Sequence, residues 1–127
     1  MKLLLDTHIF LWLISGDRQL LSTWRDSICN RDNESYLSVV SLWEVTVKYQ
    51  LGKLPLPEPP EIYLPKQRDR HLISSLSLEE SSVTQLANLP LLHRDPFDRM
   101  LICQALDRGL TIVTVDPKIC AYSVNVL

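Results

Sequence analysis

Four carboxylates stand where predicted strands and helices of this chain meet, and their positions suggest a shared site. They are Asp6, Glu44, Asp98 and Asp116. Bringing carboxylates together without a cation is unfavourable, because like charges raise one another's pKa. A hard divalent cation removes this penalty and prefers oxygen ligands, and Mg²⁺ typically takes a couple of carboxylates and keeps its waters. Such a site can lower the pKa of a bound water and stabilise the charge that develops on a phosphate.

The stretch from His93 to Leu101 supplies two aspartates at the start of a predicted helix. Pro96 is well placed at the first helical position, and Asp95 before it can cap the helix. Asp98 falls at the third position, near the positive end of the helix dipole. Helix-start chemistry alone explains both acids, so a chemical role for Asp98 depends on the other carboxylates.

Each of the other acids also has a structural explanation. Ser41 and Glu44 match the spacing of a capping box, in which the Glu side chain bonds back to the Ser amide. Asp116 followed by Pro117 is a common turn opening. Asp6 is harder to dismiss, because a carboxylate at the end of a buried strand caps nothing unless it starts the next helix. Taken together, the four acids favour a site over four separate structural roles.

Apolar runs alternate with segments of helical periodicity along the chain. We predict strands at residues 2–5, 36–40, 72–76, 111–115 and 123–126. We predict helices at residues 7–13, 21–30, 41–51, 60–70, 77–88 and 96–108. Strands that alternate with helices specify an α/β fold with a mainly parallel sheet and right-handed crossovers. Ligands bind such sheets outside the carboxyl ends of the strands, and three of the four acids directly follow a predicted strand.

Composition predicts a single folded domain over residues 1–127, with 46% hydrophobic and 22% charged residues. No apolar run approaches the roughly 20 residues that a membrane span needs. Three cysteines without metal-ligand spacing suit reduced thiols, and no signal-peptide pattern opens the chain, so we predict a cytoplasmic protein. A net charge of −2 argues mildly against a protein that merely coats nucleic acid. It does not exclude a nuclease, whose acidic metal site lowers the net charge.

Four blocks of the sequence resemble the signature blocks of PIN domains, and most closely those of the VapC-type ribonuclease toxins of bacterial toxin–antitoxin pairs. The blocks are Leu4-Leu5-Asp6-Thr7-His8, Ser41-Leu42-Trp43-Glu44, His93-Arg94-Asp95-Pro96-Phe97-Asp98-Arg99 and Thr114-Val115-Asp116. They span essentially the whole chain in order. The resemblance implies a three-layer α/β/α fold with a mainly parallel five-stranded sheet of order 3-2-1-4-5. It also implies dependence on Mg²⁺ or Mn²⁺ and endonucleolytic cleavage of RNA.

Carried over position by position, the resemblance implies catalytic and metal-binding roles for the acids. The core acids are Asp6, Glu44 and Asp98, the more variable fourth acid is Asp116, and accessory positions are Asp95, Thr7 and Thr114. The reaction would be in-line attack of a metal-bound water on an RNA phosphodiester. Asp6 and Asp98 would be direct ligands, and Glu44 would bind the metal through water or orient the nucleophile.

Cationic residues flank these acids. Arg94 and Arg99 could hold substrate phosphates, and we assign them to substrate binding, although ion pairing with neighbouring acids explains them equally well. His93 stays open between that role and a loop histidine. Lys48 follows Glu44 by four residues, the favourable spacing for a helix ion pair, so we predict a structural role for it.

A cognate antitoxin and a homodimer are the partners that the resemblance implies, with the antitoxin's peptide tail lying over an apolar groove and blocking the site. Three alternatives remain on the same fold: a non-catalytic binding module, a metal-dependent phosphatase and a DNA nuclease. Phosphatases with an aspartyl nucleophile need a second Asp two residues after the first, and the chain has His8 there.

Overall fold

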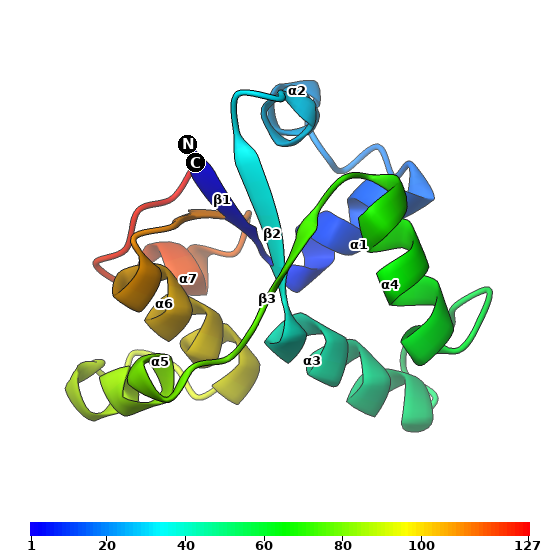
Figure 1. Cartoon of the computed structure of the whole chain (residues 1–127). Helices are drawn as coiled ribbons and strands as arrows, with labels where there is room; N and C mark the ends of the chain where they lie inside the picture. The colour runs from blue at the N-terminus through cyan, green and yellow to red at the C-terminus, as the bar shows by residue number, and fades with distance from the viewer.

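A parallel sheet of four strands runs through the middle of the molecule in the order β3-β2-β1-β4 (Figure 1). The computed structural model describes all of residues 1–127. The strands are β1 (Lys2–Leu5), β2 (Glu34–Ser38), β3 (Ser74–Leu76) and β4 (Thr111–Val113). Each neighbouring pair is parallel, so the carboxyl ends of all four strands lie along one edge. This confirms the predicted parallel α/β sheet and the predicted order of its first four strands.

The predicted fifth strand at residues 123–126 is reduced to a single parallel bridge between Ile112 and Val126. Its two backbone hydrogen bonds, from Ile112 N to Asn125 O and from Leu127 N to Ile112 O, both involve the same residue of β4. Residues 121–124 form a turn and bends instead of extended backbone, which shortens the ladder. The segment still lies at the predicted outer edge beside β4.

Seven α-helices and one 3₁₀-helix connect the strands. They are α1 (Thr7–Ser15), α2 (Ser22–Cys29), α3 (Val39–Gln50), α4 (Pro60–Arg70), α5 (Glu80–Thr84), η1 (Gln85–Asn88), α6 (Pro96–Arg108) and α7 (Pro117–Cys120). Figure 1 shows α1 and α4 on one side of the sheet and α6 and α7 on the other. The predicted three-layer arrangement is confirmed. None of the helices is both long and apolar enough to cross a lipid bilayer.

Two apolar clusters fill the spaces between the sheet and the helix layers. Successive side chains of a strand point to opposite faces, so Leu3 and Leu5 pack in one cluster with α1, α2, α3 and α4. Leu4 lies in the other cluster with Ile112, α6 and α7. The three leucines are fully buried, as expected for a strand covered on both faces. This packing fixes β1 and therefore the position of the residue that follows it, Asp6.

Helix α3 begins earlier than predicted. Ser38 is its N-cap, and the Ser38 Oγ accepts a hydrogen bond from Val40 N at 3.0 Å. The predicted strand to residue 40 was therefore two residues too long, because the β-branched Val39 and Val40 are typical of strands but here open a helix. The capping-box interpretation of Ser41 and Glu44 is wrong, since both lie inside α3.

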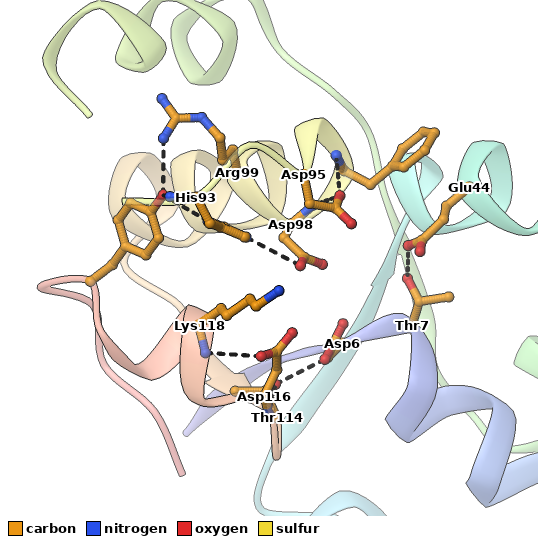
Figure 2. A network of polar contacts seen from close by, with 12 residues as sticks. Asp6, Thr7, Glu44, His93, Asp95, Asp98, Arg99, Thr114, Asp116 and Lys118 are labelled. Carbon is orange, nitrogen blue, oxygen red and sulfur yellow. Dashed lines mark hydrogen bonds and ion pairs between the residues drawn. The ribbon is translucent and has the colours of Figure 1, made fainter. Parts of the chain in front are cut away.

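Helix α6 begins and ends where the sequence predicts. Asp95 is the N-cap, and its Oδ1 accepts hydrogen bonds from Phe97 N at 2.9 Å and Asp98 N at 3.0 Å. Pro96 stands at the first helical position, and Gly109 ends the helix with a φ of 65°, a conformation that favours glycine. The helix runs back across the sheet, so its N-terminus lies at the carboxyl edge of the strands (Figure 2).

The predicted helix at residues 77–88 is shorter in the structure. It begins at Glu80 and continues as the 3₁₀ turn of η1. Helix α7 was not predicted at all, although Asp116 and Pro117 repeat the N-cap and first-position pattern of Asp95 and Pro96. The Asp116 side chain caps this helix by accepting a hydrogen bond from Lys118 N at 2.9 Å.

Candidate active site

Acidic side chains from four elements gather at the carboxyl edge of the sheet. Asp6 follows β1, Glu44 lies in α3, Asp98 lies in the first turn of α6 and Asp116 caps α7. Figure 2 shows Asp6, Asp98 and Asp116 facing a common space, with Glu44 at its side beside Thr7. The structure therefore brings together the acids that sequence reasoning singled out.

Asp6 is 3% exposed and is held by a threonine from the neighbouring strand's end. The Thr114 Oγ1 donates a hydrogen bond to Asp6 Oδ2 at 2.8 Å and accepts one from Asp116 N at 3.0 Å. Asp6 occupies the N-cap position of α1, yet its side chain makes no capping hydrogen bond. Burial raises the pKa of this carboxyl, and the Thr114 hydrogen bond offsets part of the rise. Its carboxylate is therefore buried without a helix-capping function.

Asp98 carries the clearest sign of crowded negative charge. Burial, followed by the neighbouring carboxylates of Asp95 and Asp6, raises its pKa to about 6. The His93 Nε2 lies 3.3 Å from Asp98 Oδ2 and counteracts the rise. Glu44 adds a further repulsion, so each of the two core partners predicted for Asp98 acts on it through its charge.

Glu44 is equally buried, at 3% exposed, but its charge is compensated. The Thr7 Oγ1 lies 2.8 Å from Glu44 Oε1 and 2.9 Å from Ser41 Oγ. The Lys48 ammonium donates a hydrogen bond to Glu44 Oε2 from one turn further along α3. The hydrogen bond between Glu44 and Lys48 confirms the predicted helix ion pair. Both oxygens of Glu44 are thus engaged by this chain's own side chains.

The flanking cations differ in what they contact. Arg99 Nη1 donates hydrogen bonds to Pro90 O and to the Tyr122 hydroxyl, each at 2.9 Å, so these contacts favour a structural role for Arg99 over the predicted phosphate binding. Arg94 is exposed and makes no ion pair. Sequence reasoning missed Lys118, whose side chain extends toward the space between Asp98 and Asp116 (Figure 2). The unrecognised helix start at Asp116 was the signal that could have placed it.

The donor set fits a hard divalent cation held by few protein ligands. Every candidate donor is a carboxylate or hydroxyl oxygen, which suits Mg²⁺ or Mn²⁺. No three acidic, His or Cys side chains lie close enough together to form a closed cage. One or two carboxylates plus waters is the coordination that Mg²⁺ normally takes. Asp6 and Asp98 fit it best, because their carboxylates make no ion pair with a Lys or Arg and cap no helix. Glu44, in contrast, is paired with Lys48, and Asp116 caps α7.

Comparison with known proteins places the chain in a family. Residues 3–125 match the family model described as the PIN domain. Ribonuclease VapC16 of Mycobacterium tuberculosis is 43% identical over 49 residues, which cover 39% of this chain and 35% of that relative. The match therefore spans about a third of the relative's length.

Solved structures share the whole fold at low sequence identity. VapBC2 from Rickettsia felis, bound to a DNA fragment from its promoter, aligns with a TM-score of 0.75 and 17% identity over 100% of this chain and 98% of that chain. DNA-bound VapBC from Salmonella typhimurium aligns with a TM-score of 0.72 and 17% identity, over 100% and 97% of the two chains. At these identities the likeness establishes the fold.

Proposed function

Because the chain belongs to the PIN domain family, we propose that it is an endoribonuclease that cleaves RNA phosphodiester bonds with the help of Mg²⁺ or Mn²⁺. One observation carries the proposal: Asp6 and Asp98 converge on the carboxyl edge of the sheet, and neither forms an ion pair with a Lys or Arg. A buried pair of this kind costs free energy unless a cation is part of the working site. Nuclease chemistry makes use of such a cation.

Asp6 and Asp98 are the residues that would hold the ion. When bound, a divalent cation supplies a water of lowered pKa and stabilises negative charge on the attacked phosphate. Thr114 fixes the Asp6 carboxylate through its hydrogen bond to Oδ2. Asp95 caps α6 and so sets the position of Asp98 in the first turn of that helix. These contacts leave the two carboxylates aimed at the same space.

Glu44 and Asp116 take supporting roles in this proposal. Since both Glu44 oxygens already accept hydrogen bonds from Thr7 and Lys48, Glu44 would contact the ion or orient the nucleophile through a water molecule. Asp116 is half-buried, and its Oδ1 caps α7, so Oδ2 is the oxygen available to complete or tune the cation site. Lys118, beside it, and Arg94 would hold RNA phosphates on either side of the cleaved bond.

An antitoxin partner is supported by a groove that leads to these acids. Apolar residues Leu11, Trp12, Leu56 and Tyr63 line a cavity of about 300 Å³ between α1 and the loop of residues 54–57. The cavity continues, through shared residues, into a second hollow of about 310 Å³ lined by Glu44 and two lysines. A peptide with apolar residues in the first cavity would reach the active site. Solved structures of this fold include a toxin–antitoxin complex from Klebsiella pneumoniae and VapBC-5 of Mycobacterium tuberculosis, a member of the VapBC family of toxin–antitoxin systems. We therefore propose that this chain is the toxin of such a pair.

A homodimer is supported by exposed apolar side chains around α5 and the start of α3. Trp43 is 56% exposed and Leu91 is 70% exposed, and both line a cavity of about 420 Å³ with Leu78 and Leu86. Grouped exposure of this kind marks an interaction surface. Light scattering should give twice the chain mass, and Leu91→Asp should give a monomer. A monomeric wild-type protein would overturn this part.

Cleavage of an RNA panel tests the proposed activity. The wild-type protein should cleave RNA internally in Mn²⁺ and be inactive in EDTA. Asp6→Asn should lose activity, whereas Asp26→Asn, an exposed change in α2, should keep it. Equal activity of the Asp6→Asn protein would contradict the proposed site. Preferential cleavage of DNA, or release of phosphate from p-nitrophenyl phosphate without RNA cleavage, would replace the ribonuclease with one of the alternatives.

A further inference from the structure

A network of hydrogen bonds leads from Arg99 through Tyr122 and His93 to Asp98. The Arg99 Nη1 lies 2.9 Å from the Tyr122 hydroxyl, the hydroxyl lies 2.8 Å from His93 Nδ1, and His93 Nε2 lies 3.3 Å from Asp98 Oδ2. The His93 backbone N also donates to the Tyr122 hydroxyl, at 3.2 Å. Figure 2 shows this hydrogen-bond network ending at the Asp98 carboxylate, which faces the other acids.

Counting hydrogens fixes the direction of each bond. A phenol oxygen can accept two hydrogen bonds and donate one. Arg99 Nη1 and the His93 backbone N can only donate, so they occupy both acceptor positions of Tyr122. The hydroxyl hydrogen is then left for His93 Nδ1, which must accept it. The ring hydrogen of His93 therefore lies on Nε2, where it faces Asp98.

We infer that Tyr122 and His93 are positioning residues that hold Asp98 for cation binding, with Tyr122 donating to His93 Nδ1 and His93 donating from Nε2 to Asp98 Oδ2. This arrangement leaves Asp98 Oδ1 free to contact a cation or a bound water. Its link to cation binding rests on the proposed function. Hydrogen-bonded partners of metal-binding side chains orient those side chains and typically change metal affinity or activity 10- to 100-fold when lost.

The burial of the network supports a positioning role over substrate contact. Tyr122 is 4% exposed, and the side chains of His93 and Asp98 are 10% and 13% exposed. Tyr122 also packs edge-on against the His93 ring, with centroids 5.4 Å apart. A side chain this enclosed cannot reach an RNA phosphate without breaking the network. His93 thus acts on the reaction through Asp98.

NMR of the metal-free protein tests the hydrogen positions without any need for activity. Long-range ¹H–¹⁵N spectra at pH 7.5 should place the His93 ring hydrogen on Nε2, with the resonances assigned by their loss in His93→Gln. Tyr122→Phe should move the Nδ1 resonance, whereas Tyr36→Phe, which removes an exposed hydroxyl, should not. A ring hydrogen on Nδ1, or an unmoved Nδ1 resonance in Tyr122→Phe, would overturn the inference.

Metal affinity and kinetics test the positioning role. Gln can present an amide N–H near the position of Nε2, and Asn is too short to do so. His93→Asn and Tyr122→Phe should weaken Mn²⁺ binding and lower kcat by about tenfold with the RNA KM unchanged, and His93→Gln should retain most of both. A raised KM with unchanged kcat would instead identify His93 as a phosphate contact and overturn the inference. If the wild-type protein cleaves no RNA, the proposed function fails, while the NMR and Mn²⁺ readouts still decide this inference.

Discussion

Glu44 and Asp98 lie on opposite sides of one site, and only the Glu44 carboxylate forms an ion pair with a Lys or Arg. Glu44 is compensated by the Lys48 ammonium and by the Thr7 hydroxyl. Asp98 faces the carboxylates of Asp95 and Asp6 and receives a single hydrogen bond from a histidine ring. Burial and these neighbouring carboxylates raise the pKa of Asp98 to about 6.

The two sides of the site therefore differ in whether the carboxylate has a Lys or Arg partner within this chain. On the α3 side, the Glu44 carboxylate is paired with the Lys48 ammonium of the same helix. On the side built by β1 and α6, Asp6 and Asp98 repel each other and neither forms an ion pair with a Lys or Arg. A divalent cation relieves such repulsion. The following predictions test that division.

The largest effect is expected for Asp98→Asn. RNA cleavage should fall by about a hundredfold or more, since the change removes a proposed direct ligand of the cation rather than a supporting contact. In EDTA the same protein should melt at a higher temperature than wild type, because the amide removes repulsion from Asp6 and Asp95. Cleavage assays and thermal melts measure the two effects. A variant that is both active and less stable would contradict the comparison.

Thr114→Val should come next. The valine keeps the shape of the side chain but leaves Asp6 Oδ2 without its donor and Asp116 N without its acceptor. We expect a loss of about 1–3 kcal/mol in the free energy of unfolding, measured with urea, together with weaker Mn²⁺ binding. Thr111→Val in β4 is the control, because no side-chain hydrogen bond of Thr111 would be lost. Equal effects of the two changes would rule out a special role for Thr114.

Lys48→Met tests the ion pair between Lys48 and Glu44. Glu44 would keep its burial and lose its ammonium, so the free energy of unfolding should fall by about 1–2 kcal/mol, less than for a fully buried pair because Lys48 is 39% exposed. Adding Glu44→Gln should recover part of the loss, which a double-mutant cycle measures. Lys53→Met, at an exposed lysine without an ion pair, should have little effect. A Lys48→Met protein as stable as wild type would show that Glu44 needs no partner.

The smallest effect is a pH dependence of the metal-free protein. Between the ordinary Asp pKa of 3.8 and about 6, folded Asp98 keeps a proton that the unfolded chain releases. Asp98 therefore favours folding at low pH, and its contribution declines as the pH rises through this window and then levels off. The difference in free energy of unfolding between Asp98→Asn and wild type should grow by on the order of 1 kcal/mol from pH 4 to 6.5. Urea titrations in EDTA measure this difference, and a constant one would contradict the raised pKa.

Local signals in the sequence were enough to predict the elements whose ends are marked by capping residues. Helix α6 lies between Asp95 with Pro96 and Gly109, and α4 begins at Pro60; both were predicted with their observed bounds. Helix α3 was misplaced because Ser38, its true cap, is followed by two valines that favour strands. The prediction of a fifth strand at residues 123–126 was wrong because pairing with β4 depends on the path of residues 121–124. No local sequence pattern specifies that path.

The acids of the site were predictable for a similar reason, and their partners were not. Asp6 and Asp98 stand at a strand end and a helix start, where the topology brings them to one edge. Tyr122, in contrast, reaches His93 across 29 residues of sequence, and Thr114 reaches Asp6 across 108. Such contacts depend on how α6, α7 and β1 pack together, which follows from the whole fold.

Calorimetric titration with Mn²⁺ tests the central claim most directly. The wild-type protein should bind Mn²⁺ at the site of Asp6 and Asp98, Asp98→Asn should lose that binding, and Glu44→Gln should retain it with weaker affinity. Mn²⁺ binding by Asp98→Asn equal to that of wild type, or its loss in Glu44→Gln alone, would contradict the account.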